Sequence, residues 1–337
     1  MNMVRLGKTE IQVSKNGFGA LPIQRITKAE AVYLLQKAFY HGINYFDTAR
    51  AYFDSEEKLG AAFPYVREKL IISTKTAAQD AKGFWADLEE SLRKLGTDYI
   101  DIYQFHNPAF CPKPGDESGL YDAALKAKEE GKIRHIGITN HRLAVAKEAI
   151  ASGLYETLQF PFSYLASKEE FQLVETCKEA DMGFIAMKAL SVGLIHNSAC
   201  AYAFMNQPQF AHVAPIWGIQ KEKELDEFLA HAACPPVLDE ELKGQIQKDI
   251  QQLSGDFCRG CGYCMPCPAG IEINNCARMS LMLRRAPQAD WLSKEWQEKM
   301  AKIEGCLHCN ACMKKCPYGL NTPELLAKNY EDYKTFL

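Results

Sequence analysis

Short apolar runs alternate with longer stretches of helical periodicity through the first 235 residues of the chain. The stretch 83–95, for example, has the apolar spacing of a helix, with Phe84, Leu88 and Leu92 on one face. Eight β-branched or aromatic runs predict strands over residues 17–21, 43–47, 70–75, 99–105, 134–138, 157–160, 183–187 and 213–218. Because strand–helix alternation implies parallel strands with right-handed crossovers, eight such units predict an α/β fold, a closed (β/α)8 TIM barrel.

An open, doubly wound sheet is the main alternative to the barrel. A dinucleotide-binding fold of that kind carries G-x-G-x-x-G at the turn between its first strand and helix. The chain has only Gly17-Phe18-Gly19 there, without the third glycine. The barrel is therefore the better interpretation.

The cysteines divide the chain into two regions. Four of the thirteen lie scattered before residue 240, whereas nine fall between Cys258 and Cys316. With 337 residues, the chain also exceeds the ~150 residues of a typical domain. We therefore predict a barrel over 1–235, a helical linker over 236–255 and a small, mainly α-helical domain with a C-terminal tail over 256–337.

Charge and hydropathy limit the binding partners and the cellular location that we expect for the protein. The 39 basic and 42 acidic residues give a net charge of −3, which provides no general attraction to nucleic acid or anionic lipid. Residues 189–220 lack Lys, Arg, Asp and Glu, but Asn197, Pro208 and Pro215 exclude a membrane span. The first residues lack the apolar core of a signal peptide. We expect a soluble, cytoplasmic protein without nucleic-acid or membrane partners.

Four polar side chains follow consecutive predicted strands. Asp47, Lys75 and His106 end the second, third and fourth strands, and Tyr52 lies five residues beyond Asp47. In a barrel, these positions share the face that carries chemistry. Each residue alone has a plain structural explanation, such as a helix cap, a solvated lysine or a structural histidine. Together, a carboxylate, a phenol, an amine and an imidazole suit proton transfer to a carbonyl oxygen.

Group chemistry assigns a role to each of the four. A phenol with a pKa of about 10 is a poor acid at neutral pH. A neighbouring ammonium stabilises the phenolate and lowers that pKa, and a carboxylate keeps the ammonium charged and oriented. The imidazole can orient the substrate oxygen through a hydrogen bond.

These residues lie within motifs that resemble the aldo-keto reductases. The matching segments, in chain order, are Arg5-Leu-Gly-Lys-Thr, Gly42-Ile-Asn-Tyr-Phe-Asp-Thr-Ala, then Tyr52 and Ser55-Glu-Glu-Lys-Leu-Gly60, Ile71-Ile-Ser-Thr-Lys75, Leu95-Gly-Thr-Asp-Tyr-Ile-Asp-Ile-Tyr-Gln-Phe-His106 and Gly131-Lys-Ile-Arg-His-Ile-Gly-Ile-Thr-Asn140. The resemblance covers about residues 3–230. It implies a catalytic tetrad in which Tyr52 is the acid/base, Lys75 and Asp47 tune it, and His106 orients the substrate.

The resemblance also implies a nicotinamide dinucleotide, NADH or NADPH, across the mouth of the barrel. The residues implied to contact it are Gly19, Asp47, Thr139, Asn140, Gln159, Met187, Leu190 and Gly218, with Thr139, Asn140 and Gln159 holding the carboxamide. Two positions depart from the family. Met187 and the residues after it replace the aromatic side chain that commonly stacks on the nicotinamide. Glu224 stands near the position of a phosphate-binding arginine, with Lys221 and Lys223 nearby, which leaves NADH or NADPH open.

Two cysteine motifs predict iron–sulfur clusters. Residues 306–317 read C-x2-C-x2-C-x3-C-P, the bacterial ferredoxin spacing, and residues 258–268 repeat it with one residue fewer before the last cysteine. Since the fourth cysteine of such a run ligates the other cluster, we assign one [4Fe-4S] cluster to Cys258, Cys261, Cys264 and Cys316. The second receives Cys306, Cys309, Cys312 and Cys267. Zinc is the alternative, although zinc sites favour separated C-x2-C pairs.

The two regions together leave three hypotheses about function. The first is an oxidoreductase that interconverts a small-molecule carbonyl and an alcohol, with hydride from NAD(P)H and clusters linked to an external carrier such as a ferredoxin or flavodoxin. The second is a nicotinamide-independent reductase that receives single electrons from its clusters. The third is an electron-transfer or partner-binding protein with a vestigial barrel.

Overall fold

The computed structural model describes residues 1–253, 257–285 and 288–337. It divides into two compact units, one formed by residues 1–189 and 198–239 and the other by residues 190–197 and 240–337. The boundary that the sequence predicts between residues 255 and 256 lies outside the described residues. The two units are described in turn.

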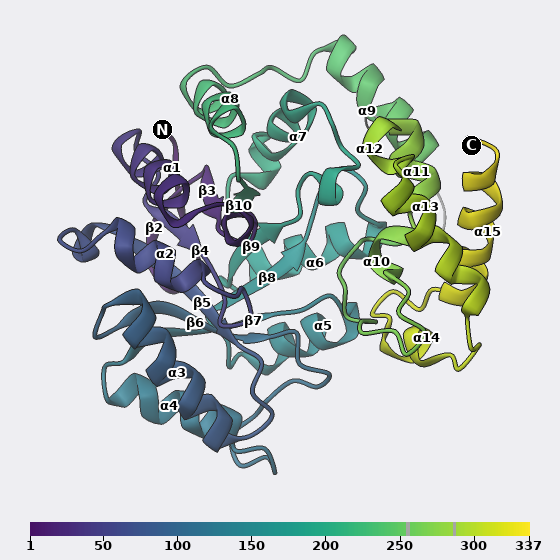
Figure 1. Cartoon of the computed structure of the whole chain (residues 1–337). Coiled ribbons are helices and arrows are strands. Elements are labelled where there is room, and N and C mark those ends of the chain that lie inside the picture. Colours follow the sequence, from purple (N-terminus) through teal and green to yellow (C-terminus); the bar gives the residue numbers. More distant parts are fainter. Residues whose placement is uncertain (254–256, 286–287) are drawn as a thin grey trace. The chain divides into compact units, whose positions relative to one another are not determined.

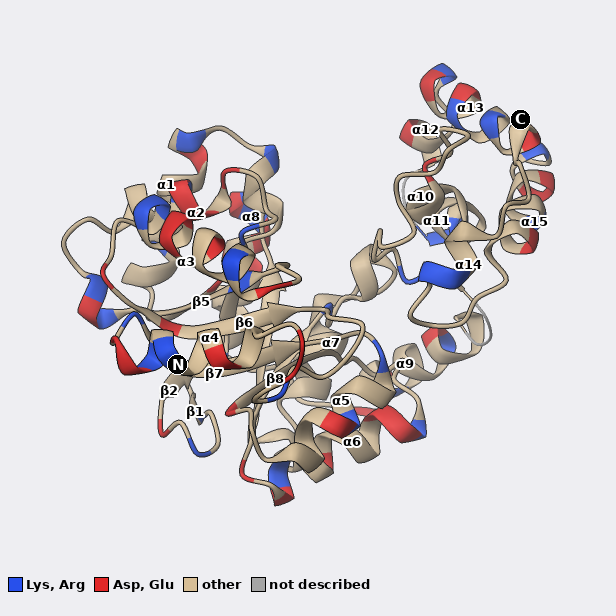
Figure 2. Cartoon of the chain, turned by 90° about the horizontal axis from the view of Figure 1, so that it is seen from below, with Lys and Arg blue, Asp and Glu red and all other residues tan. Residues whose placement is uncertain are grey.

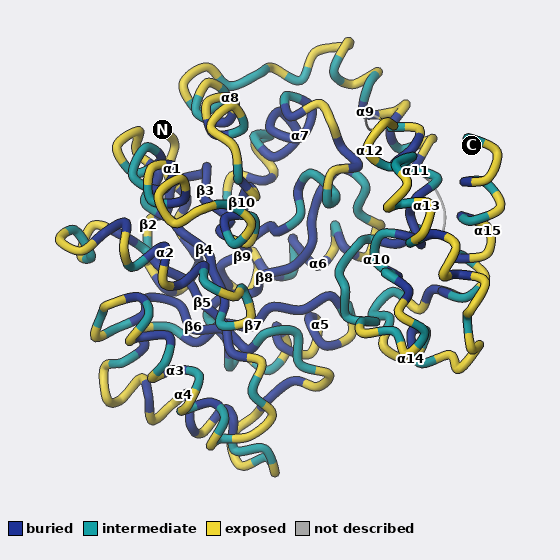
Figure 3. Tube along the Cα trace, in the orientation of Figure 1, coloured by how far each residue is buried: buried dark blue, intermediate teal, exposed yellow. Residues whose placement is uncertain are grey.

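Eight parallel strands close into a barrel in the first unit (Figure 1). They are β3 (Gly17–Gly19), β4 (Tyr45–Asp47), β5 (Ile71–Thr76), β6 (Ile100–His106), β7 (Ile133–Thr139), β8 (Thr157–Pro161), β9 (Gly183–Met187) and β10 (Val213–Gly218). Each strand pairs with its neighbour in sequence, and β10 returns to pair with β3. The predicted (β/α)8 fold is confirmed. The strands are buried on both faces, which explains their nearly continuous apolar runs (Figure 3).

Eight α-helices belong to the described part of this unit. They are α1 (Lys28–Tyr40), α2 (Ser55–Ala62), α3 (Ala81–Leu95), α4 (Leu120–Glu129), α5 (Leu143–Ser152), α6 (Lys168–Glu179), α7 (Ser198–Met205) and α8 (Glu222–Ala233). Local sequence sets their ends. Helix α1 begins in a capping box of Thr27 with Glu30, and α3 ends at Gly96, whose φ of +65° favours glycine.

A short hairpin packs at the end of the barrel where the strands begin. Its strands are β1 (Met3–Arg5) and β2 (Gln12–Ser14), and Gly7 forms a bridge with Met182, directly before β9. Val4 and Val13 join the apolar interior of the barrel. The hairpin thus covers one end, whereas the predicted functional side chains lie at the other.

The second unit is helical in its described residues. Its α-helices are α9 (Glu240–Gln252), α10 (Ile273–Cys276), α11 (Met279–Arg285), α12 (Gln288–Trp291), α13 (Lys294–Ala301), α14 (Ala311–Lys315) and α15 (Thr322–Lys334). The predicted C-terminal tail is helix α15, which buries Leu326 and Tyr333. Helices α13 and α15 carry charges of both signs along their length (Figure 2). The segment 190–197, which follows β9 in the chain, also belongs to this unit.

Buried polar contacts hold this helical unit together. Asp249 on α9 pairs with Arg285 on α11 at 2.6 Å, and the Asp249 side chain is 1% exposed. Asn329 on α15 accepts a hydrogen bond from the backbone N–H of Ser280. Among the described helices of the whole chain, none is long and apolar enough to cross a membrane.

Candidate functional site

The carboxyl ends of four neighbouring strands bring polar side chains into register. Asp47 on β4 pairs with Ser73 on β5, and Lys75 pairs with Gln104 on β6. His106, two residues further along β6, pairs with Thr139 on β7. Because side chains two residues apart on a strand point to the same face, both Ser73 and Lys75 lie on the face that carries the site.

An ion pair lies at the centre of this site. The Lys75 ammonium donates to Oδ1 and Oδ2 of Asp47 at 2.8 and 2.7 Å, and to the carbonyl oxygen of Thr48 at 2.5 Å. The side chains of Lys75 and Asp47 are 1% and 3% exposed. Burial lowers the pKa of Lys75, and the adjacent Asp47 carboxylate opposes that effect. The carboxylate therefore helps to keep a buried amine charged.

Tyr52 and His106 complete the predicted set. Tyr52 lies in the turn between β4 and α2, and the Lys75 ammonium is 5.2 Å from the centroid of its ring. The Tyr52 and His106 rings are 5.8 Å apart, with an angle of 83° between their planes. The structure thus brings together all four side chains that the sequence singled out.

His106 is poised as a neutral imidazole. Burial, followed by the ammonium groups of Lys75 and Lys188, lowers its pKa to about 3. A neutral imidazole carries one N–H donor and one acceptor nitrogen, so it can hydrogen-bond a substrate oxygen without bringing a positive charge.

Sequence reasoning missed the residues that support Asp47. Ser73 Oγ donates to Asp47 Oδ1 at 2.6 Å, and Gln104 Nε2 lies 3.5 Å from the same oxygen. Gln104 also donates to Oε1 of Gln159 at 2.8 Å. The signal was present, since Ser73 and Gln104 stand two residues before Lys75 and His106 on the same strands. A second polar layer at that spacing indicates support for a polar site.

The three residues expected to hold a nicotinamide carboxamide differ in how strongly their side chains are hydrogen-bonded to other parts of the protein. Both side-chain atoms of Asn140 bond the backbone, Nδ2 to the carbonyl of Pro108 and Oδ1 to the N–H groups of His141 and Arg142. Thr139 Oγ1 makes only a long contact of 3.9 Å with the Met187 sulfur. Gln159 Nε2 reaches Asp47 at 3.3 Å. The Thr139 hydroxyl and Nε2 of Gln159 therefore have weaker protein partners to exchange for a ligand, whereas Oε1 of Gln159 already accepts a hydrogen bond from Gln104 at 2.8 Å.

The remaining expected contacts lie at strand ends or just beyond them. Gly19 ends β3 and pairs with both Asp47 and Gly218. A Cβ at Gly19 would lie 3.0 Å from the carbonyl oxygen of Trp217, so the backbone approaches closely there. Met187 ends β9 and is 8% exposed, and Leu190 belongs to the second unit.

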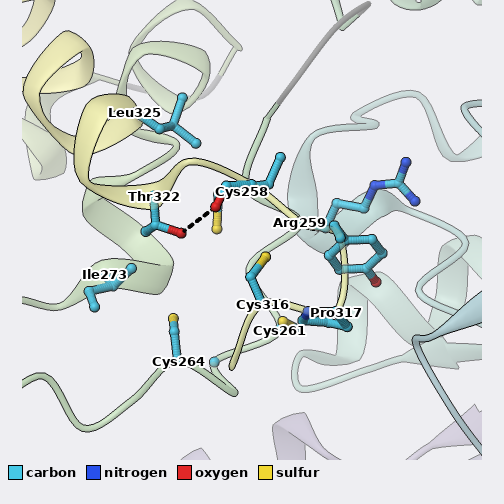
Figure 4. Close-up of a pocket in the computed structure, with 12 residues that line it drawn as sticks. Cys258, Arg259, Cys261, Cys264, Ile273, Cys316, Pro317, Thr322 and Leu325 are labelled. Atoms are coloured by element: carbon cyan, nitrogen blue, oxygen red, sulfur yellow. Dashed lines mark hydrogen bonds between the residues drawn. The ribbon is translucent and has the colours of Figure 1, made fainter. Parts of the chain in front are cut away.

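The first predicted cysteine set lines one cavity of the second unit. Cys258, Cys261, Cys264 and Cys316 lie on its walls, with Arg259 and Tyr318 nearby (Figure 4). Cys316 comes from the second sequence motif, as the crossed assignment predicts. The backbone N–H of Gly260 donates to the Cys258 sulfur at 3.4 Å. Four thiols around one cavity are a donor set that fits an iron–sulfur cluster.

The second predicted set lines a neighbouring cavity. Its walls include Cys267, Cys306, Cys309 and Cys312. Cys264 lines both cavities. Cys276, the ninth cysteine of the region, is fully buried and lines neither.

The thiol spacing differs from that of a site for a single ion. Among the described residues, no three His, Cys, Asp or Glu side chains converge closely enough to hold one metal ion. A zinc site would draw four ligands to within about 2.3 Å of one point. A cubane cluster is a larger body, and each of its iron atoms takes a separate thiolate.

A closed barrel with a buried Lys–Asp pair at its strand ends, together with thiol-lined cavities, is an arrangement that suits an oxidoreductase enzyme. Residues 15–203 match the profile of the Aldo/keto reductase family, and residues 257–321 match a 4Fe-4S dicluster domain. The first match spans more than half of the length of the chain. The chain therefore belongs to the aldo/keto reductase family, and it carries an iron–sulfur domain at its C-terminal side.

Relatives and solved structures agree with this membership. The chain is 27% identical to the uncharacterized oxidoreductase YqkF of Bacillus subtilis over 283 residues, covering 74% of this chain and 90% of that protein. It is 31% identical over 209 residues to L-galactose dehydrogenase of Arabidopsis thaliana, covering 56% of this chain and 66% of that enzyme. The fold resembles aldo-keto reductase AKR11C1 of Bacillus halodurans, with a TM-score of 0.62, 22% identity, and coverage of 74% and 96%.

Proposed function

We propose that this enzyme interconverts a carbonyl and an alcohol, with Tyr52 as the group that gives and takes the proton. The observation that carries the proposal is the position of the Tyr52 ring, 5.2 Å from the Lys75 ammonium and 5.8 Å from the His106 ring. A small-molecule carbonyl compound is the substrate class that suits this site.

The proton chemistry follows from the neighbours of Tyr52. A phenol gives up its proton more readily when a cation stabilises the phenolate. Lys75 supplies that cation, and Asp47 holds it by accepting two hydrogen bonds. As the alkoxide develops on the substrate, the phenol protonates it, and His106 orients the same oxygen as a neutral hydrogen-bonding group.

A nicotinamide would supply the hydride when bound. Thr139 and Gln159 fit its carboxamide, because a buried hydroxyl with only a 3.9 Å sulfur contact and an amide at 3.3 Å from its acceptor are available for stronger bonds. Asn140 could join them only by giving up its bonds to the backbone. Gly19, Asp47, Met187, Leu190 and Gly218 are the other proposed contacts.

The cysteines would hold two [4Fe-4S] clusters. Cys258, Cys261, Cys264 and Cys316 would hold the first, and Cys267, Cys306, Cys309 and Cys312 the second. Such clusters exchange single electrons, so they suit a relay to an external carrier such as a ferredoxin or flavodoxin. The crossed cysteine sets and the sharing of Cys264 by both cavities support this arrangement.

A nicotinamide-independent reductase is the second candidate. Two observations favour it, namely the backbone bonds that occupy Asn140 and the absence of an aromatic residue at Met187. Calorimetric titration of the holoprotein with NADH and NADPH separates the two candidates. Binding in the micromolar range supports hydride transfer from nicotinamide, whereas no binding at millimolar concentration supports the second candidate.

Tyr52→Phe tests the catalytic role. We expect kcat to fall about 10²–10⁴-fold with a panel of simple aldehydes and ketones, because the acid/base group is lost. The visible absorbance of the clusters should not change. Tyr65→Phe is the matched control, since Tyr65 is 91% exposed and outside the site. Full activity of Tyr52→Phe would remove Tyr52 from the mechanism.

A further inference from the structure

The second unit buries an arginine that has no carboxylate partner among the residues that the structure describes. Arg278 lies between α10 and α11 and is 6% exposed. Its Nη1 donates to the carbonyl oxygen of Val192 at 2.9 Å. Across the described residues, its Nε has no hydrogen-bond partner, and no acidic side chain pairs with the guanidinium. A buried cation is costly without an anion, so the structure calls for a negative group beside it.

The guanidinium lies against the loop that joins Cys258 to Cys261. A Cβ at Gly260 would come 3.0 Å from Nη1 and 3.2 Å from Cζ of Arg278. The N–H of the same glycine donates to the Cys258 sulfur. An arginine guanidinium keeps its positive charge in proteins, and the cysteines of this loop carry negative charge when they bind a cluster as thiolates. The negative group that Arg278 faces is therefore the first cysteine set.

A strained segment fixes the position of this arginine. Val192, whose carbonyl accepts from Arg278, has a φ of +56°, which is rare for a β-branched residue. A second arginine bonds the same segment, since Arg285 Nε donates to the carbonyl oxygen of Leu194 at 2.8 Å. Strain of this kind persists where the surroundings hold the segment in place, and the bonds from Arg278 and Arg285 tie this segment to the same unit.

The two cavities differ in charge. Arg259 lines the first, with its guanidinium 4.6 Å from the centroid of the Tyr318 ring, and Arg278 stands behind the same cysteine loop. The described residues that line the second cavity include no charged side chain apart from its cysteines. A cluster in the first cavity would therefore lie near positive charge, whereas a cluster of the same type in the second cavity would lie among uncharged side chains.

We infer that Arg278 raises the reduction potential of the first cluster above that of the second, so that the first cluster takes up an electron before the second does. This inference rests on the cluster assignment in the proposed function. Four thiolates make the oxidised cluster anionic, and reduction adds one electron without breaking a bond or moving a proton. A buried cation favours the more negative state, and the effect is large where water is excluded.

The test is a redox titration of the holoprotein under anaerobic conditions, with dithionite as reductant and mediators present. Electron paramagnetic resonance monitors each cluster. The intact protein should show two potentials. Arg278→Gln should lower the higher potential by at least about 59 mV, a tenfold change for a one-electron couple, and leave the lower one nearly unchanged. Arg278→Lys keeps the charge and should retain most of the higher potential.

Arg284→Gln is the matched control. It removes the same charge from α11, but Arg284 is 50% exposed and pairs with Asp332, so solvent screens its effect on both clusters. Two unshifted potentials in an intact Arg278→Gln holoprotein would overturn the inference. Loss of the clusters from both Arg278→Gln and Arg278→Lys would also overturn it, because Arg278 would then serve assembly. An intact protein without cluster signals would instead contradict the proposed function.

Discussion

The ammonium of Lys75 bonds both carboxylate oxygens of Asp47, at 2.8 and 2.7 Å, in the interior of the barrel. The pair joins the ends of two adjacent strands, β4 and β5, whose register sets Asp47 beside Ser73. Since burial lowers the pKa of Lys75 and the Asp47 carboxylate raises it, the carboxylate favours the positive charge that the proposed mechanism places beside Tyr52.

Asp47→Asn should therefore weaken catalysis in a pH-dependent way. Without the carboxylate, the pKa of Lys75 falls further and the amine loses its proton at lower pH. We expect kcat/KM to drop about 10²-fold or more at neutral pH and to recover in part as the pH falls, because Lys75 regains its proton. A pH profile of kcat/KM with an aldehyde substrate measures this.

Asp101→Asn controls for the loss of a buried carboxylate as such. Asp101 is fully buried and pairs with Arg67 at 2.7 Å, near the amino end of β6 and away from the carboxyl ends of the strands that carry the site. This variant should lose stability while keeping the shape of the pH profile. An Asp47→Asn profile parallel to that of the intact enzyme would contradict the role given to the pair.

His106 should stay neutral through the acidic range. Its pKa of about 3 lies below the 6.5 of a free histidine, so the unfolded chain takes up a proton that the folded protein refuses. The free energy of unfolding should fall as the pH drops from about 6.5 toward 3, and His106→Gln should lack this part of the decline. Urea unfolding at pH 7 and pH 5 measures the difference.

His41→Gln provides the comparison, since His41 is exposed at the end of α1. It controls for the replacement of a histidine as such. Direct titration of the His106 ring by NMR offers a second measurement, and a ring that titrates near pH 6.5 in the folded protein would refute the prediction.

Gly137 makes room for the polar layer beneath the site. A Cβ there would lie 2.4 Å from Thr157 Oγ1 and 2.9 Å from Cγ of Gln104, which bonds Gln159. Gly137→Ala should lower the free energy of unfolding by about 1–3 kcal/mol and also reduce activity, because Gln104 must move. Gly244→Ala meets nothing within 4 Å on α9 and should stabilise slightly. Thermal unfolding and an activity assay measure these effects. Equal stability of the two variants would show that the space beside Gly137 is not needed.

The crossed cysteine assignment predicts which cluster each variant loses. Cys316→Ala should remove the first cluster although Cys316 belongs to the second motif, and Cys267→Ala should remove the second. Each should reduce the iron content by about half, with a different resonance signal lost. Cys276→Ala, at a fully buried thiol outside both cavities, should keep all the iron. Loss of the second signal from Cys316→Ala would reverse the assignment.

Much of the barrel could be predicted because its strands are short apolar runs between helices of clear periodicity. The strand at 183–187 matches β9, and the polar ends at Asp47, Lys75 and His106 could be read because strand ends share one face. The hairpin at the other end escaped prediction, because its strands, MVR and QVS, each bury a single apolar residue and lack the apolar run of a barrel strand. The helix at Thr322–Lys334 was expected as a tail, although Leu326 and Tyr333 already mark an apolar face.

Contacts distant in sequence were harder to predict. Ser73 and Gln104 were missed because their role depends on which side chain lies opposite across neighbouring strands. The grouping of residues 190–197 with the C-terminal helices was missed for the same reason. Neither arginine that bonds this segment is near it in the chain, and their guanidinium bonds go to backbone carbonyls, which any residue could offer.

That grouping bears on how such a two-part enzyme can be built or divided. A gene shortened after Asp239 would still encode all eight barrel strands, yet the carbonyls of Val192 and Leu194 would lose their donors, Arg278 and Arg285. The iron–sulfur unit therefore cannot be separated from the barrel by a single cut in the chain, because it includes residues 190–197. Grafting it onto another barrel would require transplanting residues 190–197, which lie between β9 and α7, along with it.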